Sequence, residues 1–300
     1  MSFSAALKTE ILENKQLRAR FKKAHAYGLF LFAKSFSEDS VQIATENAEI
    51  LKLYMSFLTD FLGKTASIIT GEREQNGKTV YTARLDGAND RRKLLAVFGQ
   101  AGGINKECLM GHGYVCAFLS GVYLACGNIT DPEKSYHIEF VVKDEVLCGE
   151  LKAVLDSCLP GAKTTRRRGV CVVYGKEYAY IEDLLTLMGA PKSCLAMIDV
   201  EMMKHVRNNA NRATNCETAN IDKMVDAARS QIEDISLVLR HIGSESLPED
   251  LQEIAKLRLQ NPYMSLKELG GLTSPGLSRS GAYHRLNRIS KLAAGIRGRQ

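Results

Sequence analysis

A weak internal repeat constrains the fold of this chain more than any other feature of its sequence. Residues 26–34 (AYGLFLFAK) align with residues 119–127 (LSGVYLACG), which places Gly28 and Gly121 at equivalent points, 93 residues apart. Both segments read as apolar helices, in which an internal glycine costs about 1 kcal/mol relative to alanine. A glycine at the same point of both helices therefore indicates a close approach of two helix backbones; two unrelated, tolerated glycines are the alternative.

The elements that follow each glycine also repeat. Apolar residues at helical spacing cover 47–63 and 143–159. Strand-like runs and closing helices surround them, at 41–44, 66–70, 79–85 and 91–98 in the first half and at 136–142, 162–165, 170–174 and 178–188 in the second. Each half reads α-β-α-β-β-α, which predicts a pseudo-twofold α+β domain made of one repeat over 1–100 and another over 101–195.

Composition excludes several other classes of protein. The 300 residues are 45% apolar and 25% charged, which is typical of globular domains and enough for two or three of them. No apolar run approaches about 18 residues, and the first residues lack the pattern of a signal peptide, so no membrane association is expected. None of the eight cysteines forms a CxxC pair, so we expect buried, reduced thiols in a cytoplasmic protein, without metal or cofactor.

The excess of positive charge lies in the C-terminal tail. After Glu268 there are six cations and no anion, which equals the net charge of +6 for the whole chain. The six are Arg279, Arg285, Arg288, Lys291, Arg297 and Arg299. A neutral body with a cationic tail favours a polyanionic partner; a solubilising tail is the alternative.

Two segments join the α+β domain to this tail. Residues 196–216 are rich in asparagine, which predicts a loop-like connector, with Arg207 and Arg212 as possible phosphate contacts. Residues 217–242 carry one apolar stripe from Ile221 to Leu239, which predicts a linking helix. A core or intramolecular docking face is the favoured interpretation of the stripe, and a dimer zipper is the alternative.

Residues 243–300 predict three helices. The Ser-x-x-Glu spacing of a capping box occurs at Ser246 and again at Ser265, opening helices that end near Gln260 and Gly271. Ser278 is the expected cap of a third helix that ends near Leu292, with Ala282, Leu286, Ile289 and Ala293 on its buried face.

The opposite face of the third helix carries hydrogen-bonding and cationic side chains without a carboxylate, after a turn longer than about four residues. A short helix, a turn and a basic helix form the pattern of a helix-turn-helix, with a protein-interaction bundle as the alternative. The candidate DNA-binding residues are Ser265, Lys267, Ser278, Arg279, Ser280, His284, Arg285, Asn287, Arg288 and Lys291. In a basic hairpin of the second repeat, Lys163, Arg166, Arg167 and Arg168 could add weak contacts or form a solvated turn.

Four segments in this order resemble the WhiA family of bacterial sporulation and cell-division regulators. They are residues 131–137 (DPEKSYH), 215–220 (NCETAN), 231–235 (QIEDI) and 265–270 (SLKELG). The resemblance implies an N-terminal domain like a LAGLIDADG homing endonuclease and a C-terminal helix-turn-helix. The predicted fold class is therefore α+β, with pseudo-twofold tandem LAGLIDADG-like repeats followed by an all-α domain.

The same resemblance tests for nuclease activity. In active homing endonucleases an acid near the end of each motif helix holds a divalent metal ion. Those positions fall on Ala33 and Cys126, which are poor ligands for magnesium, and Lys34 follows the first of them. The sequence therefore predicts a catalytically dead scaffold, unless Asp39 or Asp131 supplies the missing acid.

These observations predict a non-enzymatic, DNA-binding transcriptional regulator of cell division, chromosome segregation or sporulation, located in the cytoplasm on the nucleoid. Double-stranded DNA is the expected partner, and another regulatory protein is a second candidate. A monomer is compatible with the sequence. Two alternatives remain: a residual metal-dependent endonuclease, and an N-terminal scaffold that senses a protein or a ligand.

Overall fold

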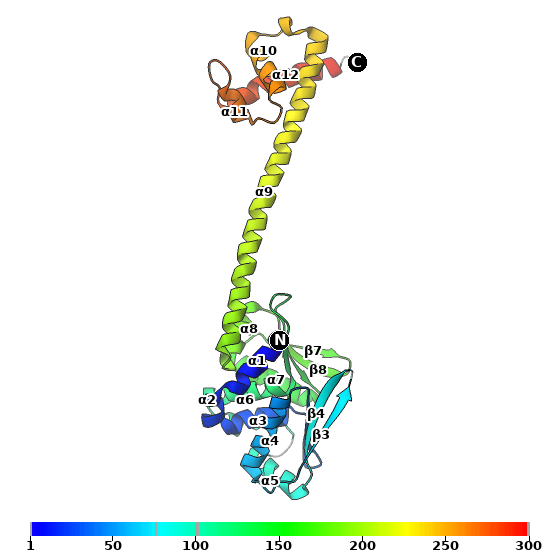
Figure 1. Ribbon diagram of the computed structural model, residues 1–300, viewed down its shortest axis with the longest axis vertical. Helices are drawn as coiled ribbons and strands as arrows, with labels where there is room; N and C mark the ends of the chain where they lie inside the picture. The colour runs from blue at the N-terminus through cyan, green and yellow to red at the C-terminus, as the bar shows by residue number, and fades with distance from the viewer. Residues whose placement is uncertain (1, 76, 100–101, 299–300) are drawn as a thin grey trace. The chain divides into compact units, whose positions relative to one another are not determined.

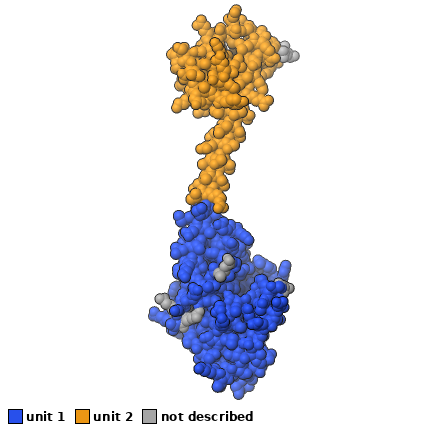
Figure 2. Space-filling model, viewed as in Figure 1, with its two compact units in different colours: residues 1–204 blue, residues 205–300 orange. Residues whose placement is uncertain are grey.

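The computed structural model describes residues 2–75, 77–99 and 102–298. The chain divides into two compact units, residues 1–204 and 205–300, which are coloured separately in Figure 2. Figure 1 shows the first unit as helices and sheets and the second as helices alone. No helix in the described ranges is both long and apolar enough to cross a membrane.

The first repeat contains the predicted elements in the predicted order, together with two earlier helices and one short strand that were not predicted. Its helices are α1 (Phe3–Glu13), α2 (Lys15–Arg20), α3 (Lys22–Leu31), α4 (Ala48–Leu62) and α5 (Ala88–Phe98). Its strands are β1 (Ser35–Phe36), β2 (Val41–Thr45), β3 (Ile68–Gln75) and β4 (Lys78–Leu85). They form an antiparallel sheet in the order β1-β2-β4-β3.

The second repeat has the same topology. A 3-10 turn (Lys106–Leu109) leads into α6 (His112–Cys126), and α7 (Glu145–Cys158) and α8 (Tyr178–Leu187) follow. The strands β5 (Gly127–Ile129), β6 (Ile138–Val142), β7 (Lys163–Arg167) and β8 (Val170–Gly175) pair antiparallel in the order β5-β6-β8-β7. In each sheet the second strand pairs with the fourth and not with the third. The two halves therefore share one topology, and the structure confirms the tandem repeat predicted from the sequence.

The two glycines lie where α3 and α6 cross. A Cβ atom built on Gly28 would lie 2.2 Å from the carbonyl oxygen of Phe118, and one built on Gly121 would lie 2.2 Å from that of His25. Each glycine thus faces the backbone of the other helix. Large side chains such as Phe30 and Tyr123 are buried around this crossing, which forms the centre of the unit's core.

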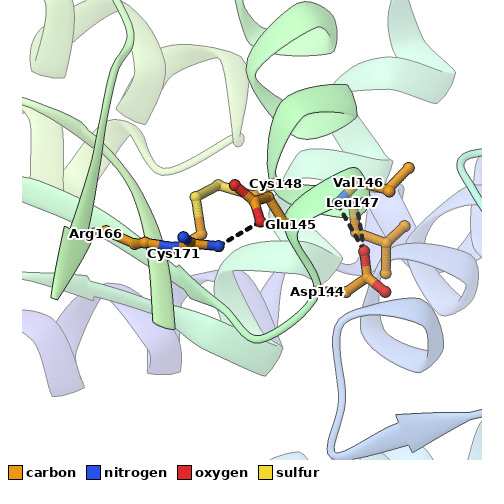
Figure 3. Close-up of a disulfide and its surroundings, with 7 residues drawn as sticks. All are labelled: Asp144, Glu145, Val146, Leu147, Cys148, Arg166 and Cys171. Carbon is orange, nitrogen blue, oxygen red and sulfur yellow. Dashed lines mark hydrogen bonds and ion pairs between the residues drawn. A yellow bond between two sulfur atoms is a disulfide. The ribbon is translucent and has the colours of Figure 1, made fainter. Parts of the chain in front are cut away.

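The cysteine expectation is wrong for one pair. Cys148 of α7 and Cys171 of β8 form a disulfide, with their Cα atoms 6.3 Å apart (Figure 3). The packing of α7 on β8 brings them together, and no linear spacing indicates this. Of the six free cysteines, Cys108, Cys116 and Cys194 are buried as expected, and Cys216 is exposed.

The predicted connector is also wrong. Residues 196–216 are part of α9, one helix from Pro191 to Ile242 that is 52 residues long. Asparagine disfavours a helix by only about 0.7 kcal/mol per residue, and residues 192–242 contain neither glycine nor proline to end it. Near its beginning, α9 is held by the segment that follows β5: Tyr136 donates a hydrogen bond to Glu201, and Lys204 donates one to the carbonyl oxygen of Pro132.

The second unit packs the end of α9 against three further helices. These are α10 (Glu249–Gln260), α11 (Leu266–Gly271) and α12 (Arg279–Arg297), and a 3-10 turn (Ser244–Ser246) precedes them. Ile235 and Val238 of α9 are buried in the same core as Leu251, Leu269 and Leu286. The boundary predicted at residue 243 therefore cuts through this core.

Of the two predicted capping boxes, one forms and the other does not. Ser265 caps α11, and its side chain and that of Glu268 make both bonds of the box. Ser246 does not cap α10, which begins after Pro248 without a side-chain cap. The residue before a proline is biased toward extended backbone, and Leu247 has ψ 146°, so the helix cannot begin before the proline.

Candidate nucleic-acid interface

The third helix of the C-terminal unit lies as its periodicity predicts. Its N-cap is Ser278, whose hydroxyl accepts a hydrogen bond from the amide of Gly281 at 3.2 Å. Ala282, Leu286, Ile289 and Ala293 are buried, and each is at most 1% exposed. The helix continues to Arg297 instead of ending near Leu292, and Gly298 is its C-cap.

The side chains predicted to contact DNA lie mostly on the exposed part of this helix. Arg279, Ser280, His284 and Lys291 are exposed, whereas Asn287 is half-buried. Neither Arg279 nor Lys291 forms an ion pair with any residue of the described ranges. Lys267 of α11 is exposed too, which leaves three accessible cations on two successive helices.

Two predicted DNA-contacting arginines are held within the unit. Arg285 is only 20% exposed in its side chain and lies 3.4 Å from Glu253 and 3.7 Å from Asp250, both in α10. Arg288 lies 3.0 Å from Asp250. These acids reduce the positive potential of the two guanidinium groups and fix α12 against α10.

Two of the serines predicted to contact DNA use their side chains to cap helices. The hydroxyl of Ser265 accepts from the amide of Glu268 and donates to its carboxylate at 2.7 Å, and Ser278 caps α12 in the same way. Hydrogen bonds from Ser265 also hold the pKa of the Glu268 carboxyl below its usual value. Both serines therefore fix the first turn of a helix.

The long turn between α11 and α12 is fixed by several hydrogen bonds. The hydroxyl of Thr273 and the amide of Leu277 both donate to the carbonyl oxygen of Gly270, at 2.8 Å each. The amide of Ser274 donates to Glu253 at 2.8 Å. A Cβ atom on Gly270 would lie 2.6 Å from the carbonyl oxygen of Leu277, so the turn packs directly on the end of α11.

One buried cation in this unit was not predicted. Arg258 of α10 is 2% exposed and donates to the carbonyl oxygen of Met264 at 2.7 Å. Burial lowers the pKa of its guanidinium group. This bond fixes the segment that leads into α11. Tyr283, which is 51% exposed beside His284, is a further accessible side chain that the charge pattern could not indicate.

The basic hairpin of the first unit is mostly neutralised. Lys163 lies 3.7 Å from Glu177 and Arg167 lies 3.4 Å from Glu139. Arg166 pairs with Glu145, as Figure 3 shows. Arg168 has a positive φ of 52° at the tip of the turn. These pairs favour the solvated-turn interpretation of the hairpin.

The degenerate acid positions lie at the ends of the two crossing helices. Ala33 follows α3, and Cys126 is the last residue of α6. Burial raises the pKa of the Cys126 thiol to about 12, although nearby Lys8 opposes the shift, so the thiol is neutral at physiological pH. Within the described ranges, no three His, Cys, Asp or Glu side chains come close enough together to hold a metal ion.

The alternative acids lie in a turn and in an exposed loop. Asp131 accepts a hydrogen bond from the amide of Glu133 at 3.0 Å and thereby stabilises a turn. Asp39 and Glu38 are exposed in the loop after β1. Tandem α+β repeats of one topology, followed by a short helix, a turn and a basic helix, define the class of this protein: a LAGLIDADG-like domain joined to a helix-turn-helix domain.

Comparison with known proteins identifies the family. Residues 115–207 match the model of the WhiA LAGLIDADG-like domain, and residues 210–293 match that of the WhiA C-terminal HTH domain. The probable cell division protein WhiA of Clostridium tetani is 35% identical over 98% of this chain and 97% of its own length. That of Clostridium novyi is 36% identical over 99% of both chains. The chain therefore belongs to the WhiA family.

A solved structure agrees with this fold. The full-length DUF199/WhiA protein from Thermatoga maritima superposes with a TM-score of 0.60 at 21% sequence identity. The match covers 98% of both chains, so both parts of the fold are shared.

Proposed function

We propose that this protein is a transcriptional regulator that binds double-stranded DNA through α12 and controls cell division, chromosome segregation or sporulation. The observation that carries the proposal is the accessible face of α12, which presents cations and hydrogen-bonding groups and no carboxylate. Such a face suits the major groove, where phosphates attract cations and base edges accept and donate hydrogen bonds. Placement in the cytoplasm, on the nucleoid, belongs to the same proposal.

The contacts divide into two roles. Arg279, Lys267 and Lys291 are the proposed phosphate contacts, because they are exposed cations. Ser280, His284 and Asn287 are the proposed readers of base edges, because their side chains can donate and accept. Arg285 and Arg288 hold α12 on α10 and contribute less to DNA affinity than the other cations.

The N-terminal domain acts in this proposal as a scaffold without nuclease activity. Ala33 offers no ligand, the neutral thiol of Cys126 is a poor ligand for magnesium, and Lys34 would repel a cation. A second regulatory protein is a candidate partner of this domain, and the relatives named as probable cell division proteins support a role in that process.

DNA binding by the full-length protein tests the proposal. Fluorescence anisotropy with genomic duplex fragments, at several salt concentrations, gives the affinity and its salt slope. Arg279→Ala and Lys291→Ala should each reduce that slope by about 0.9, the value for one lost phosphate contact. Lys256→Ala, which removes an exposed cation of α10, is the matched control and should leave the slope unchanged.

Two results would contradict the proposal. DNA affinity that is unaffected by Arg279→Ala and Lys291→Ala would remove α12 from the interface. Cleavage of the same fragments by the purified protein with magnesium would show that the scaffold retains a nuclease centre.

A further inference from the structure

A pocket lies beside Ala33 and Cys126, the two positions that align with the acids of active homing endonucleases. Its volume is about 720 Å³. Ala33 and Lys34 after α3 and Cys126 of α6 line it, together with residues from both sheets. Binding sites for small molecules typically measure about 300–1,000 Å³, so this pocket has the size of a ligand site.

Positive charge dominates the lining of the pocket. Among the described residues of the lining, Lys34, Arg73 and Lys143 contribute three cations and Asp144 contributes one carboxylate. No ion pair or hydrogen bond joins any of these three cations to a side chain in the ranges that the structure describes. By contrast, the neighbouring cations Lys78 and Arg84 on β4 are paired with Glu46 and Asp86.

The carboxylate of Asp144 already accepts hydrogen bonds from its own helix. Asp144 is the N-cap of α7, and its Oδ1 accepts from the amides of Val146 and Leu147 at 2.8 and 3.0 Å (Figure 3). These N–H groups compensate part of the negative charge of Asp144, so its carboxylate cannot neutralise three cations. The disulfide between Cys148 and Cys171 anchors this first turn of α7 to the sheet.

The rest of the wall is apolar. Phe36 and Leu147 line the pocket from β1 and α7, and Val141 of β6 is 40% exposed. The ring of Phe36 is supported by stacking on Phe30, with the ring centroids 6.1 Å apart. A ligand that fits both the cationic side chains and the apolar wall has an anionic group and a flat, less polar portion.

We propose that the pocket binds a small phosphorylated ligand of the nucleotide class, with phosphates on Lys34, Arg73 and Lys143 and the base against the apolar wall. In this proposal, the positions that align with the acids of active homing endonucleases line an anion site. The proposal commits to a small ligand over the backbone of duplex DNA because the cations surround a hollow with an apolar wall. It does not depend on the function of the C-terminal helix-turn-helix.

Isothermal titration of the full-length protein with ATP and, separately, with GTP tests this proposal. At least one of them should bind, and binding should weaken as salt increases because the cations are exposed. Lys34→Glu and Lys143→Glu should each weaken binding by about tenfold or more, since a charge-assisted contact is replaced by repulsion. Lys64→Glu reverses an exposed lysine outside the pocket and should have no effect.

The other outcomes overturn the proposal. Binding of neither nucleotide, or equal weakening by Lys64→Glu and Lys34→Glu, excludes a specific site here. The affinity for duplex DNA is also measured, in a variant that carries both Arg279→Ala and Lys291→Ala. If Lys34→Glu lowers DNA affinity there while neither nucleotide binds, the cations contact a DNA backbone and the small-ligand proposal is wrong. Circular dichroism of each variant checks that these surface substitutions leave the fold intact.

Discussion

The glycines at positions 28 and 121 allow two helices to pack closely, because glycine has a hydrogen atom where other residues have a Cβ atom. Each glycine faces a carbonyl oxygen of the other helix, at a distance that no Cβ atom tolerates. The neighbouring backbone cannot rotate away as a side chain could, because it is part of a helix. The sequence predicted this close approach correctly from two equivalent glycines, but not which backbone atoms meet.

Alanine at either position should therefore destabilise the first unit. We expect Gly28→Ala and Gly121→Ala to lower the free energy of unfolding by about 3 kcal/mol, the upper part of the usual range for overpacking. Gly149→Ala is the matched control, since Gly149 also lies in a helix but has open space around it. That control should stabilise by about 1 kcal/mol or less. Urea unfolding followed by circular dichroism measures all three, and similar effects at Gly28 and Gly149 would contradict the packing argument.

At the scale of elements, caps decide where the helices of the C-terminal unit begin. Ser265 and Glu268 form a complete box at α11, and Ser278 caps α12. The Ser246 box fails because Pro248 imposes extended backbone on Leu247, an effect stronger than the spacing of two side chains. The sequence therefore predicted the existence of all three helices but misplaced the start of one.

The Glu268 cap should make stability depend on pH. Hydrogen bonds from Ser265 lower the pKa of this carboxyl in the folded state, so its contribution is fully present above the unfolded value of 4.5. It is lost as the pH falls through the lower, folded value. Glu268→Gln should thus lower the melting temperature at about pH 7 and change it less at about pH 3.

Thermal unfolding of the full-length protein at both pH values, followed by circular dichroism, measures this difference. Glu245→Gln changes an exposed glutamate of the same unit, for which the structure shows no hydrogen bond among the described residues, and serves as the control. An effect of Glu268→Gln that is the same at both pH values would show that the ionised carboxylate does not make the cap.

At the scale of the whole molecule, α9 belongs to both units. Its first turns are held by Tyr136 and Pro132, and its last turns supply Ile235 and Val238 to the core of the second unit. Asp234 in the same turns pairs with Arg297 at 2.7 Å. Residues 243–300 therefore lack part of the hydrophobic core of the helix-turn-helix domain.

Two fragments should behave differently for this reason. Residues 226–300 should unfold cooperatively on heating, whereas residues 243–300 should lose about 3–6 kcal/mol of stability with the burial of two aliphatic side chains. Circular dichroism with thermal melting compares them directly. Equal stability of the two fragments would show that the last turns of α9 are not part of the folding unit.

The sequence by itself determined the features that depend on local periodicity and on residue chemistry. The repeat and the amphipathic face of α12 can be read from it because each requires only spacing and side-chain type, and the family resemblance adds that Ala33 and Cys126 stand where active nucleases carry acids. The tertiary structure decided what depends on contacts between distant segments. It paired Cys148 with Cys171, engaged Arg285 with Glu253, continued α9 through an asparagine-rich stretch and gathered Lys34, Arg73 and Lys143 around one pocket. Packing sets these contacts, because weak local preferences yield to the free energy of burying a core.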